Sequence, residues 1–229
     1  MAVVKRIVCL ANSRKLSGRC VAGREIQDAE SWVRPVSGRP TEEVSEHERR
    51  YEDGADPRLL EVVDIPLLLH CPRTYQSENW LLDPQHHWRR AGRVAWRDLD
   101  RLAENPPLLW PNGDSTFHGL NDRVAVATAE TLSNSLYFLR LDEIELTVFV
   151  PGANFGDFRR RVRAGFRYRG IDYRLSLTDP VVEREYLSGK DGEYRVGDCF
   201  ATVSLGEPYE GFAYKLVAAL ITPSRAGRS

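Results

Sequence analysis

Arginine recurs at alternate positions between residues 159 and 174, and this repeat is the strongest chemical pattern in the sequence. The stretch reads RRRVRAGFRYRGIDYR. In a β-strand, alternate side chains point to opposite faces, so one face of this strand would be cationic and the other apolar. Guanidinium groups two residues apart would lie about 6.6 Å from one another, a spacing that suits a row of phosphates. The candidate binding residues are Arg159, Arg161, Arg163, Arg167, Arg169 and Arg174.

The opposite face of the same strand is predicted to belong to the core. It carries Val162, Ala164, Phe166 and Tyr168. A tight turn at residues 170–172 would place Tyr168 opposite Leu175, and Arg169 opposite Arg174. Like charges across a ladder are destabilising unless an anion neutralises them, which favours an anionic ligand here. Because both aromatic rings would face the core, we expect contacts with phosphates rather than stacking on bases.

A second cationic segment interrupts an apolar run near the N-terminus, in VCLANSRKLSGRCVAG, residues 8–23. Asn and Ser side chains hydrogen-bond to their own backbone and Gly18 tolerates a positive φ, so residues 12–17 are predicted to form a loop. Its candidate donors to an anion are Asn12, Ser13, Arg14, Lys15 and Arg19. For both cationic segments, the alternative is a solvated or salt-bridged exterior, because runs of charge are commonly only surface.

A serine and an acid recur at the same spacing in SLTDP, residues 176–180, and SLGEP, residues 204–208. The residues Ser176, Asp179, Ser204 and Glu207 could rim one cleft, where a carboxylate pair would supply general acid–base chemistry. The alternative, which we favour, is that Asp179 caps a helix and Glu207 opens a turn. The sequence contains no Gly-x-Ser-x-Gly, P-loop or His-Glu-x-x-His motif. We therefore assign no catalytic residue.

Composition restricts the kinds of site and partner. The four cysteines Cys9, Cys20, Cys71 and Cys199 show no C-x-x-C spacing, so we expect no metal and no cofactor. With 32 basic and 33 acidic residues the formal net charge is -1, so attraction to a polyanion must be local. No apolar run approaches the ~20 residues of a membrane span, and we expect a cytoplasmic protein with no membrane partner.

The elements that must position these residues fall into two successive sets. In the first half we predict strands over 3–11, 19–26, 31–37 and 59–70, with a helix over 41–51 whose N-cap is Thr41. Residues 71–118 are predicted to be an elaborated insertion packed by tryptophans, with a helical stretch over 94–103. Residues 124–129 are predicted to be the closing strand of this half.

The second half repeats the order of elements. We predict strands over 136–150, 159–169, 173–178, 199–205 and 213–221, and a helix from Asp179-Pro180 to Leu187. Three strands, a helix and two strands are the order of a five-stranded Greek-key barrel of the OB type. The predicted fold class is therefore mainly β with short helices: two tandem OB-like Greek-key β-barrels, over residues 1–130 and 131–229. Ligands of OB barrels bind on the second and third strands and the loops around them, which is where both cationic segments would lie.

Six short motifs occur in order along nearly the whole chain. They are KRIVCLANSRK, GRCVAG, SWVRPVS, NDRV, YRLSLTDP and YKLVAALI. With these motifs the sequence resembles the prokaryotic dual OB-containing domain family. The resemblance implies two fused OB folds and an association with bacterial conflict or defence systems, and it implies no catalytic residues.

The leading hypothesis is a non-enzymatic module that binds nucleic acid or a nucleotide through the two cationic segments. One alternative is an enzyme that acts on nucleotides or nucleic acid, with Asp179 and Glu207 in a cleft. Another is a protein-interaction module with a protein partner in a defence complex, because OB barrels also bind peptides.

Overall fold

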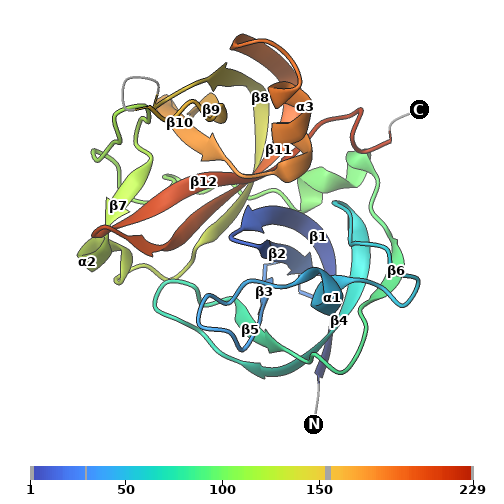
Figure 1. Ribbon diagram of the computed structural model, residues 1–229. Coiled ribbons are helices and arrows are strands. Elements are labelled where there is room, and N and C mark those ends of the chain that lie inside the picture. The colour runs from blue at the N-terminus through green and yellow to red at the C-terminus, as the bar shows by residue number, and fades with distance from the viewer. Residues whose placement is uncertain (1–2, 29, 153–155, 228–229) are drawn as a thin grey trace. The chain divides into compact units, whose positions relative to one another are not determined.

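The chain forms two compact units, each built around a β-sheet (Figure 1). The computed structural model describes residues 3–28, 30–152 and 156–227. Unit 1 contains the chain up to Ala103, together with Ser133–Leu136 and the C-terminal residues from Pro223. Unit 2 contains Glu104–Leu132 and Tyr137–Thr222. This division differs from the predicted domains, 1–130 and 131–229, in placing residues 104–130 with the second unit.

Unit 1 contains six strands and two short helices among its described residues. The strands are β1 Val3–Lys15, β2 Gly18–Glu25, β3 Trp32–Val36, β4 Glu61–His70, β5 Asn79–Leu82 and β6 Arg89–Arg93. The helices are α1 Glu46–Arg49 and the 3-10 helix η1 Trp96–Arg101.

The first barrel is closed. Its strands follow the order β1-β2-β3-β5-β4, and β4 pairs back with β1. The β3–β5 pair is parallel and the other barrel pairs are antiparallel. With α1 between the third and fourth strands, this is the connectivity predicted for an OB-type Greek key, and the predicted fold class is confirmed.

The prediction that residues 124–129 close the first barrel is wrong. The closing strand is β5, which lies inside the region 71–118 that we predicted to be an insertion. Residues 123–125 instead form β7, which pairs with a strand of unit 2. β5 is only four residues long and follows a turn-rich segment, so its alternation is too short to be recognised in the sequence.

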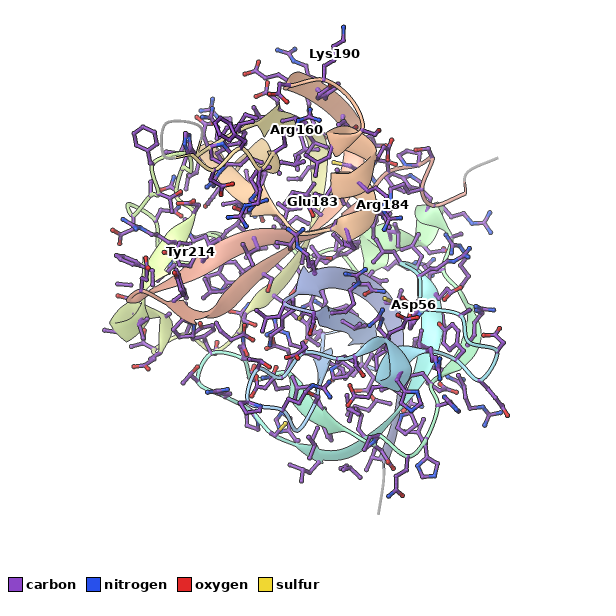
Figure 2. All side chains as sticks on the ribbon, in the orientation of Figure 1. Asp56, Arg160, Glu183, Arg184, Lys190 and Tyr214 are labelled. Carbon is purple, nitrogen blue, oxygen red and sulfur yellow. The ribbon has the colours of Figure 1, made fainter. Side chains whose placement is uncertain are left out.

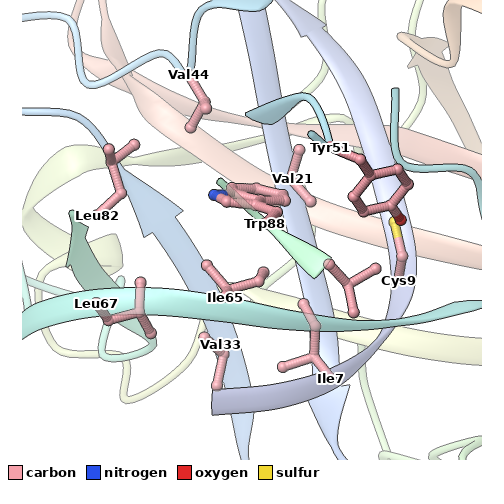
Figure 3. Close-up of a cluster of buried hydrophobic side chains, with 11 residues drawn as sticks. Ile7, Cys9, Val21, Val33, Val44, Tyr51, Ile65, Leu67, Leu82 and Trp88 are labelled. Carbon is pink, nitrogen blue, oxygen red and sulfur yellow. The ribbon is translucent and has the colours of Figure 1, made fainter. Parts of the chain in front are cut away.

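Inward-facing side chains of the barrel strands form the core of unit 1. The cluster includes Ile7, Cys9, Val21, Val33, Val63, Ile65 and Leu67. Figure 3 shows Val21, Ile65 and other labelled members of the cluster around the indole of Trp88. Odd-numbered residues of β1 and β4 point inward, as a period of two requires. One tryptophan from the aromatic-rich region thus packs the barrel, as predicted for that region.

The helix of unit 1 starts later than predicted. Its N-cap is Ser45 rather than Thr41, and α1 ends at Arg49. Ser45 and Glu48 form a capping box, in which the Ser45 side chain accepts from the Glu48 amide and the Glu48 carboxylate accepts from the Ser45 amide. A reciprocal cap satisfies two orphan amides at once, which explains why the helix starts at Ser45.

Among the described residues, unit 2 contains the remaining strands and two helices. The strands are β7 Arg123–Ala125, β8 Leu136–Phe149, β9 Arg161–Tyr168, β10 Ile171–Leu177, β11 Gly192–Tyr209 and β12 Phe212–Ile221. The helices are α2 Val126–Ala129 and α3 Pro180–Leu187. The sheet order is β10-β9-β8-β11-β12-β7, and a parallel β10–β12 pair makes the sheet a ring. This is again the OB order, with α3 between its third and fourth strands.

The parallel β10–β12 pair is short, and a further segment of the chain bonds to both strands beside it. Only Ser176 and Leu177 of β10 pair with β12. Further along, Leu120 exchanges two backbone hydrogen bonds with Arg174 on β10, and the carbonyl of Asp122 accepts from the amide of Lys215 on β12. A segment that precedes β7 therefore joins the two strands where they diverge. We call residues 111–122 the strap.

The register of the β9–β10 hairpin differs from the prediction by four residues. Tyr168 pairs with Ile171, and Arg174 pairs with Gly165 rather than with Arg169. The turn has two residues, Arg169 and Gly170, which both have positive φ, at 49° and 81°. This is the geometry of a primed hairpin turn. A shift of four keeps every side chain on its face, so the apolar pattern alone could not distinguish the two registers.

Candidate nucleic-acid interface

The β9–β10 hairpin has one buried face and one face that carries the arginines. Even-numbered residues of β9 are buried, from Val162 to Tyr168, whereas Arg161 and Arg163 are partly exposed and Arg167 is exposed. The ring of Phe166 stacks on Tyr173 on the buried side, with centroids 5.5 Å apart. The predicted alternation of this strand is confirmed by burial.

The neighbouring strands β8 and β10 place both acidic and basic side chains beside the arginines of β9, which we call the arginine row. Gly165 has Glu145 of β8 as its partner on one side and Arg174 of β10 on the other. Asp172 pairs with Arg167, and the carboxylate is 3.8 Å from the guanidinium. The predicted repulsion between Arg169 and Arg174 is therefore absent, because the shorter turn replaces it with an attractive cross-strand pair.

Arg163 is used by the fold. Its guanidinium lies 3.0 Å from a carboxylate oxygen of Asp122, and this acid is 3% exposed. The same carboxylate accepts from the amide and the hydroxyl of Thr116, at 2.7 and 2.6 Å. A buried carboxylate needs such partners, so Arg163 anchors the strap to β9.

Two further arginines of the predicted set have partners within the chain. Arg159 binds Asp157 through Nε and Nη2, which lowers the pKa of that carboxyl. Arg169 donates to the side chain and the carbonyl of Asn105. The neighbouring Arg160, labelled in Figure 2, was not included in the prediction. It binds Asp191 and the carbonyl of Leu187 at the end of α3.

Arg161 and Arg174 differ from these. Within the described part of the chain, neither guanidinium lies within 4 Å of a carboxylate oxygen. Arg174 is exposed on β10, and Arg161 is partly exposed at the start of β9. Arg161 donates one hydrogen bond, to the carbonyl of Arg160 at 3.4 Å. Arg167, whose side chain is 69% exposed, lies 3.8 Å from Asp172 and donates to the carbonyl of Gly170. A guanidinium carries five N–H donors, so all three arginines keep donors for a ligand on this face.

The strap places aromatic rings beside the start of the arginine row. Phe117 is 94% exposed and its ring meets that of His118, with centroids 4.7 Å apart. His118 in turn contacts Phe149 at 5.1 Å. Phe149 lies at the end of β8 and is the register partner of Arg161. The two rings of β9 itself face the core, as predicted, and the exposed ring near this face comes from a segment distant in sequence.

A buried lysine holds the other end of the strap. Lys215 is 1% exposed and donates to the carbonyl of Pro111 at 2.9 Å and to Oδ1 of Asn112 at 2.6 Å. Asn112 donates to the hydroxyl of Tyr173, whose ring centroid is 5.4 Å from the ammonium group. Burial lowers the pKa of Lys215 to about 7, although the Asp122 carboxylate favours the charged form.

The family model for the dual OB-containing domain matches residues 5–220. The chain belongs to this family. Searches of curated proteins and of solved structures find no match. Both the family and the two closed sheets of this dual OB-containing protein therefore identify it as an OB-fold binding module.

The predicted loop in the first barrel of this dual OB-containing protein is shorter than expected. β1 continues to Lys15, and the turn is only Leu16 and Ser17. Asn12 donates to the carbonyl of Pro57, and Ser13 donates to that of Cys20 and is 5% exposed. The fold therefore uses both neutral donors that we assigned to a ligand.

The cations of that hairpin tip lie near its end. Arg14 and Arg19 face each other across the strands, and Lys15 pairs with Gly18. The Arg19 amide and carbonyl bond to Val44. The pKa of Glu43 is lowered, first by a hydrogen bond from Thr41 and also by the charges of Arg39 and Lys15. The tip is thus attached to the segment before α1.

Asp179 has a structural role in the second barrel. Its Oδ1 accepts from the amides of Val181 and Val182 at the start of α3, as predicted for an N-cap, and its Oδ2 accepts from the amide of Leu220. Glu207 lies near the register shift between Leu205 and Pro208. Leu205 pairs with Lys215, five residues from Leu220, which corresponds to about 16 Å along β12. The structure does not bring the two acids together.

Metal sites in proteins need several His, Cys, Asp or Glu side chains close together. Across 3–28, 30–152 and 156–227, His, Cys, Asp and Glu side chains form no group of three or more that could hold a metal ion. In the same ranges, the helices are too short or too polar to cross a membrane.

Sequence reasoning missed the strap and what it contributes. Phe117 and His118 lie between DST and GLND, which are turn-forming residues typical of a loop. A Phe-His pair in such a polar segment is the one signal that could have indicated an exposed aromatic site. Nothing in the sequence indicates that Asp122 would meet Arg163, 41 residues away.

Proposed function

We propose that this protein binds nucleic acid through the outer face of β9 and β10. The observation that carries the proposal is the group of three guanidinium groups, Arg161, Arg167 and Arg174, on the second and third strands of a barrel. These are the strands on which OB barrels bind oligonucleotides. The strand order supports the proposal, because β9 and β10 are the second and third strands of the second barrel.

The geometry suits a chain of phosphates. Arg161 and Arg167 are on the same strand face and six residues apart, about 20 Å along β9. Arg174 lies beside Gly165, between them and one strand further on. Gly165 has no side chain, so a ligand backbone can approach the sheet there. Guanidinium groups bind phosphates through paired hydrogen bonds, which gives direction as well as attraction.

Acids on the same face limit the strength of binding. Asp172 and Glu145 flank the row, and Asp122 neutralises Arg163. Since the formal net charge of the chain is -1, long-range steering is weak. We therefore expect moderate affinity and marked sensitivity to salt.

The hairpin tip of the first barrel is a secondary part of the proposal. Arg14, Lys15 and Arg19 remain the cations assigned to it, and Asn12 and Ser13 are no longer included. The setting that we propose is a cytoplasmic location and, as the family resemblance implies, a role in a bacterial defence system.

The test reverses the charge of the three proposed phosphate-binding arginines in one variant. In the full chain, Arg161, Arg167 and Arg174 are changed to Glu, and binding of a labelled 12-nucleotide single strand is measured by fluorescence anisotropy at several salt concentrations. We expect affinity to fall at least tenfold at low salt. The slope of log affinity against log salt should become shallower by about 2, since three phosphate contacts are lost.

The control carries the same change in charge elsewhere. Arg101, Arg184 and Arg195 are exposed and lie outside the β9–β10 face, and their reversal to Glu alters the net charge equally. Arg163 is left unchanged because its loss would unpair Asp122. If the control weakens binding as much as the test variant, the effect is only net charge and the proposed site is rejected.

A further inference from the structure

Phe117 is an exposed aromatic side chain that the fold of unit 2 does not use for packing. At 94% exposed it has the highest exposure among the large apolar side chains that the structure describes. Exposure of a single apolar residue is common at protein surfaces. Here, however, the ring contacts His118, which contacts Phe149, the register partner of Arg161 on the cationic face.

The Phe117 ring contacts a neighbouring ring, that of His118. The ring of His118 meets it edge to face, with an interplanar angle of 84°. His118 is held in turn by Phe149 and lies 3.2 Å from the carbonyl of Pro151 through Nε2. Phe149 pairs with Arg161, and Thr116, which precedes Phe117, contacts the guanidinium of Arg163. The aromatic group therefore begins where the arginine row begins.

The strap that carries Phe117 is tightly held before any ligand binds. Asp122 accepts three hydrogen bonds, from the amide and hydroxyl of Thr116 and from Arg163. Gly119 lies so close to this carboxylate that a Cβ there would be 1.8 Å from Oδ2. A platform that is already ordered loses little conformational entropy on binding, so its contacts contribute more fully to affinity.

We propose that Phe117 is a stacking platform for an unpaired base, and that it makes the site select single-stranded over double-stranded nucleic acid. This inference rests on the proposed function of the β9–β10 face. Phosphates alone do not distinguish a single strand from a duplex, whereas a base must be unstacked and unpaired to lie on an aromatic ring. Phe117 supplies the ring and Arg161 the adjacent phosphate contact.

The test compares Phe117→Ala with Phe117→Trp in the full chain. The probes are a labelled 12-nucleotide DNA single strand, an RNA of the same sequence and a 12-base-pair DNA duplex. For Phe117→Ala we expect single-strand affinity to fall at least about fivefold, with duplex affinity and the salt slope unchanged. Phe117→Trp should restore single-strand binding, because a larger ring also stacks.

Controls separate stacking from folding and from general apolar contact. Since Phe117 is exposed, the thermal midpoint of Phe117→Ala should equal that of the unmodified protein. Leu69→Ala, which truncates another exposed apolar residue in unit 1, should leave all three affinities unchanged. Equal loss of single-strand and duplex binding in Phe117→Ala, or no loss in either, overturns the stacking role.

The two proposals fail differently. If the arginine reversals weaken binding and Phe117→Ala does not, the binding face stands and the platform is wrong. If none of the probes binds the unmodified protein, the proposed function itself fails. A third outcome is that Phe117→Ala weakens single-strand binding while the arginine reversals weaken it no more than their control does. Phe117 would then contact bases, but the phosphates would bind elsewhere. The inference as stated would be rejected.

Discussion

At the scale of single residues, arginines that look equivalent in sequence do different things. Arg161, Arg163 and Arg167 alternate on one strand face, yet only Arg163 meets a buried acid. Removing one partner of such a pair leaves the other buried and unpaired, at a cost of about 3–5 kcal/mol. Arg163 therefore belongs to the stability of unit 2, whereas its two neighbours are available for a ligand.

Lys215 gives a residue-scale prediction about pH. Its pKa in the folded protein is about 7, below the usual value of 10.5, because the side chain is buried. Between these values the unfolded chain binds more protons than the folded chain, so this group makes the free energy of unfolding rise as the pH increases. The contribution is at most about 1.4 kcal/mol per pH unit.

The measurement is urea unfolding at pH 7, 8 and 9, for the unmodified protein and for Lys215→Met. We expect stability to rise over this range in the first, and the rise to be reduced in the second. Lys215→Met should also be less stable at pH 9, since Pro111 and Asn112 lose a donor. Parallel pH profiles for the two proteins would show that Lys215 keeps its ordinary pKa.

At the scale of elements, Asp179 joins α3 to β12. Asp179→Ala removes the cap of α3 and the acceptor for the buried amide of Leu220, and we expect a loss of about 2–4 kcal/mol in urea unfolding. Glu185→Ala, an exposed change on the same helix, is the control and should cost less than about 0.5 kcal/mol. A loss below about 1 kcal/mol for Asp179→Ala would contradict this role. Loss of an activity in a variant of Asp179 would therefore need a folding measurement before it could indicate catalysis.

At the scale of the whole molecule, residues 104–132, which lie in sequence between the strands of the two barrels, belong to unit 2. A fragment of residues 104–222 keeps the strap and β7, whereas a fragment of residues 131–229 lacks both and leaves Arg163 and Lys215 without their partners. We expect dispersed amide resonances and cooperative thermal unfolding from the first fragment only. Equal stability of the two fragments would support the predicted boundary at residues 130–131 instead.

Sequence alone was sufficient wherever the information is local. Alternation of arginine with apolar residues placed the two faces of β9, because side chains in a strand have a strict period of two. Asp179-Pro180 located the start of α3, because capping chemistry lies within three residues. The order of strands and helices indicated two OB barrels, and the closed sheets confirm this fold.

Only the tertiary structure decided which predicted site residues are available. The register of β9 and β10 depends on a two-residue turn, and a shift of four residues leaves the apolar pattern unchanged. The pairing of Arg163 with Asp122, the burial of Lys215 and the contact of His118 with Phe149 depend on contacts between residues 31 to 104 positions apart. Such contacts follow from how the barrel closes and where the strap crosses it, and no local pattern in the sequence records them.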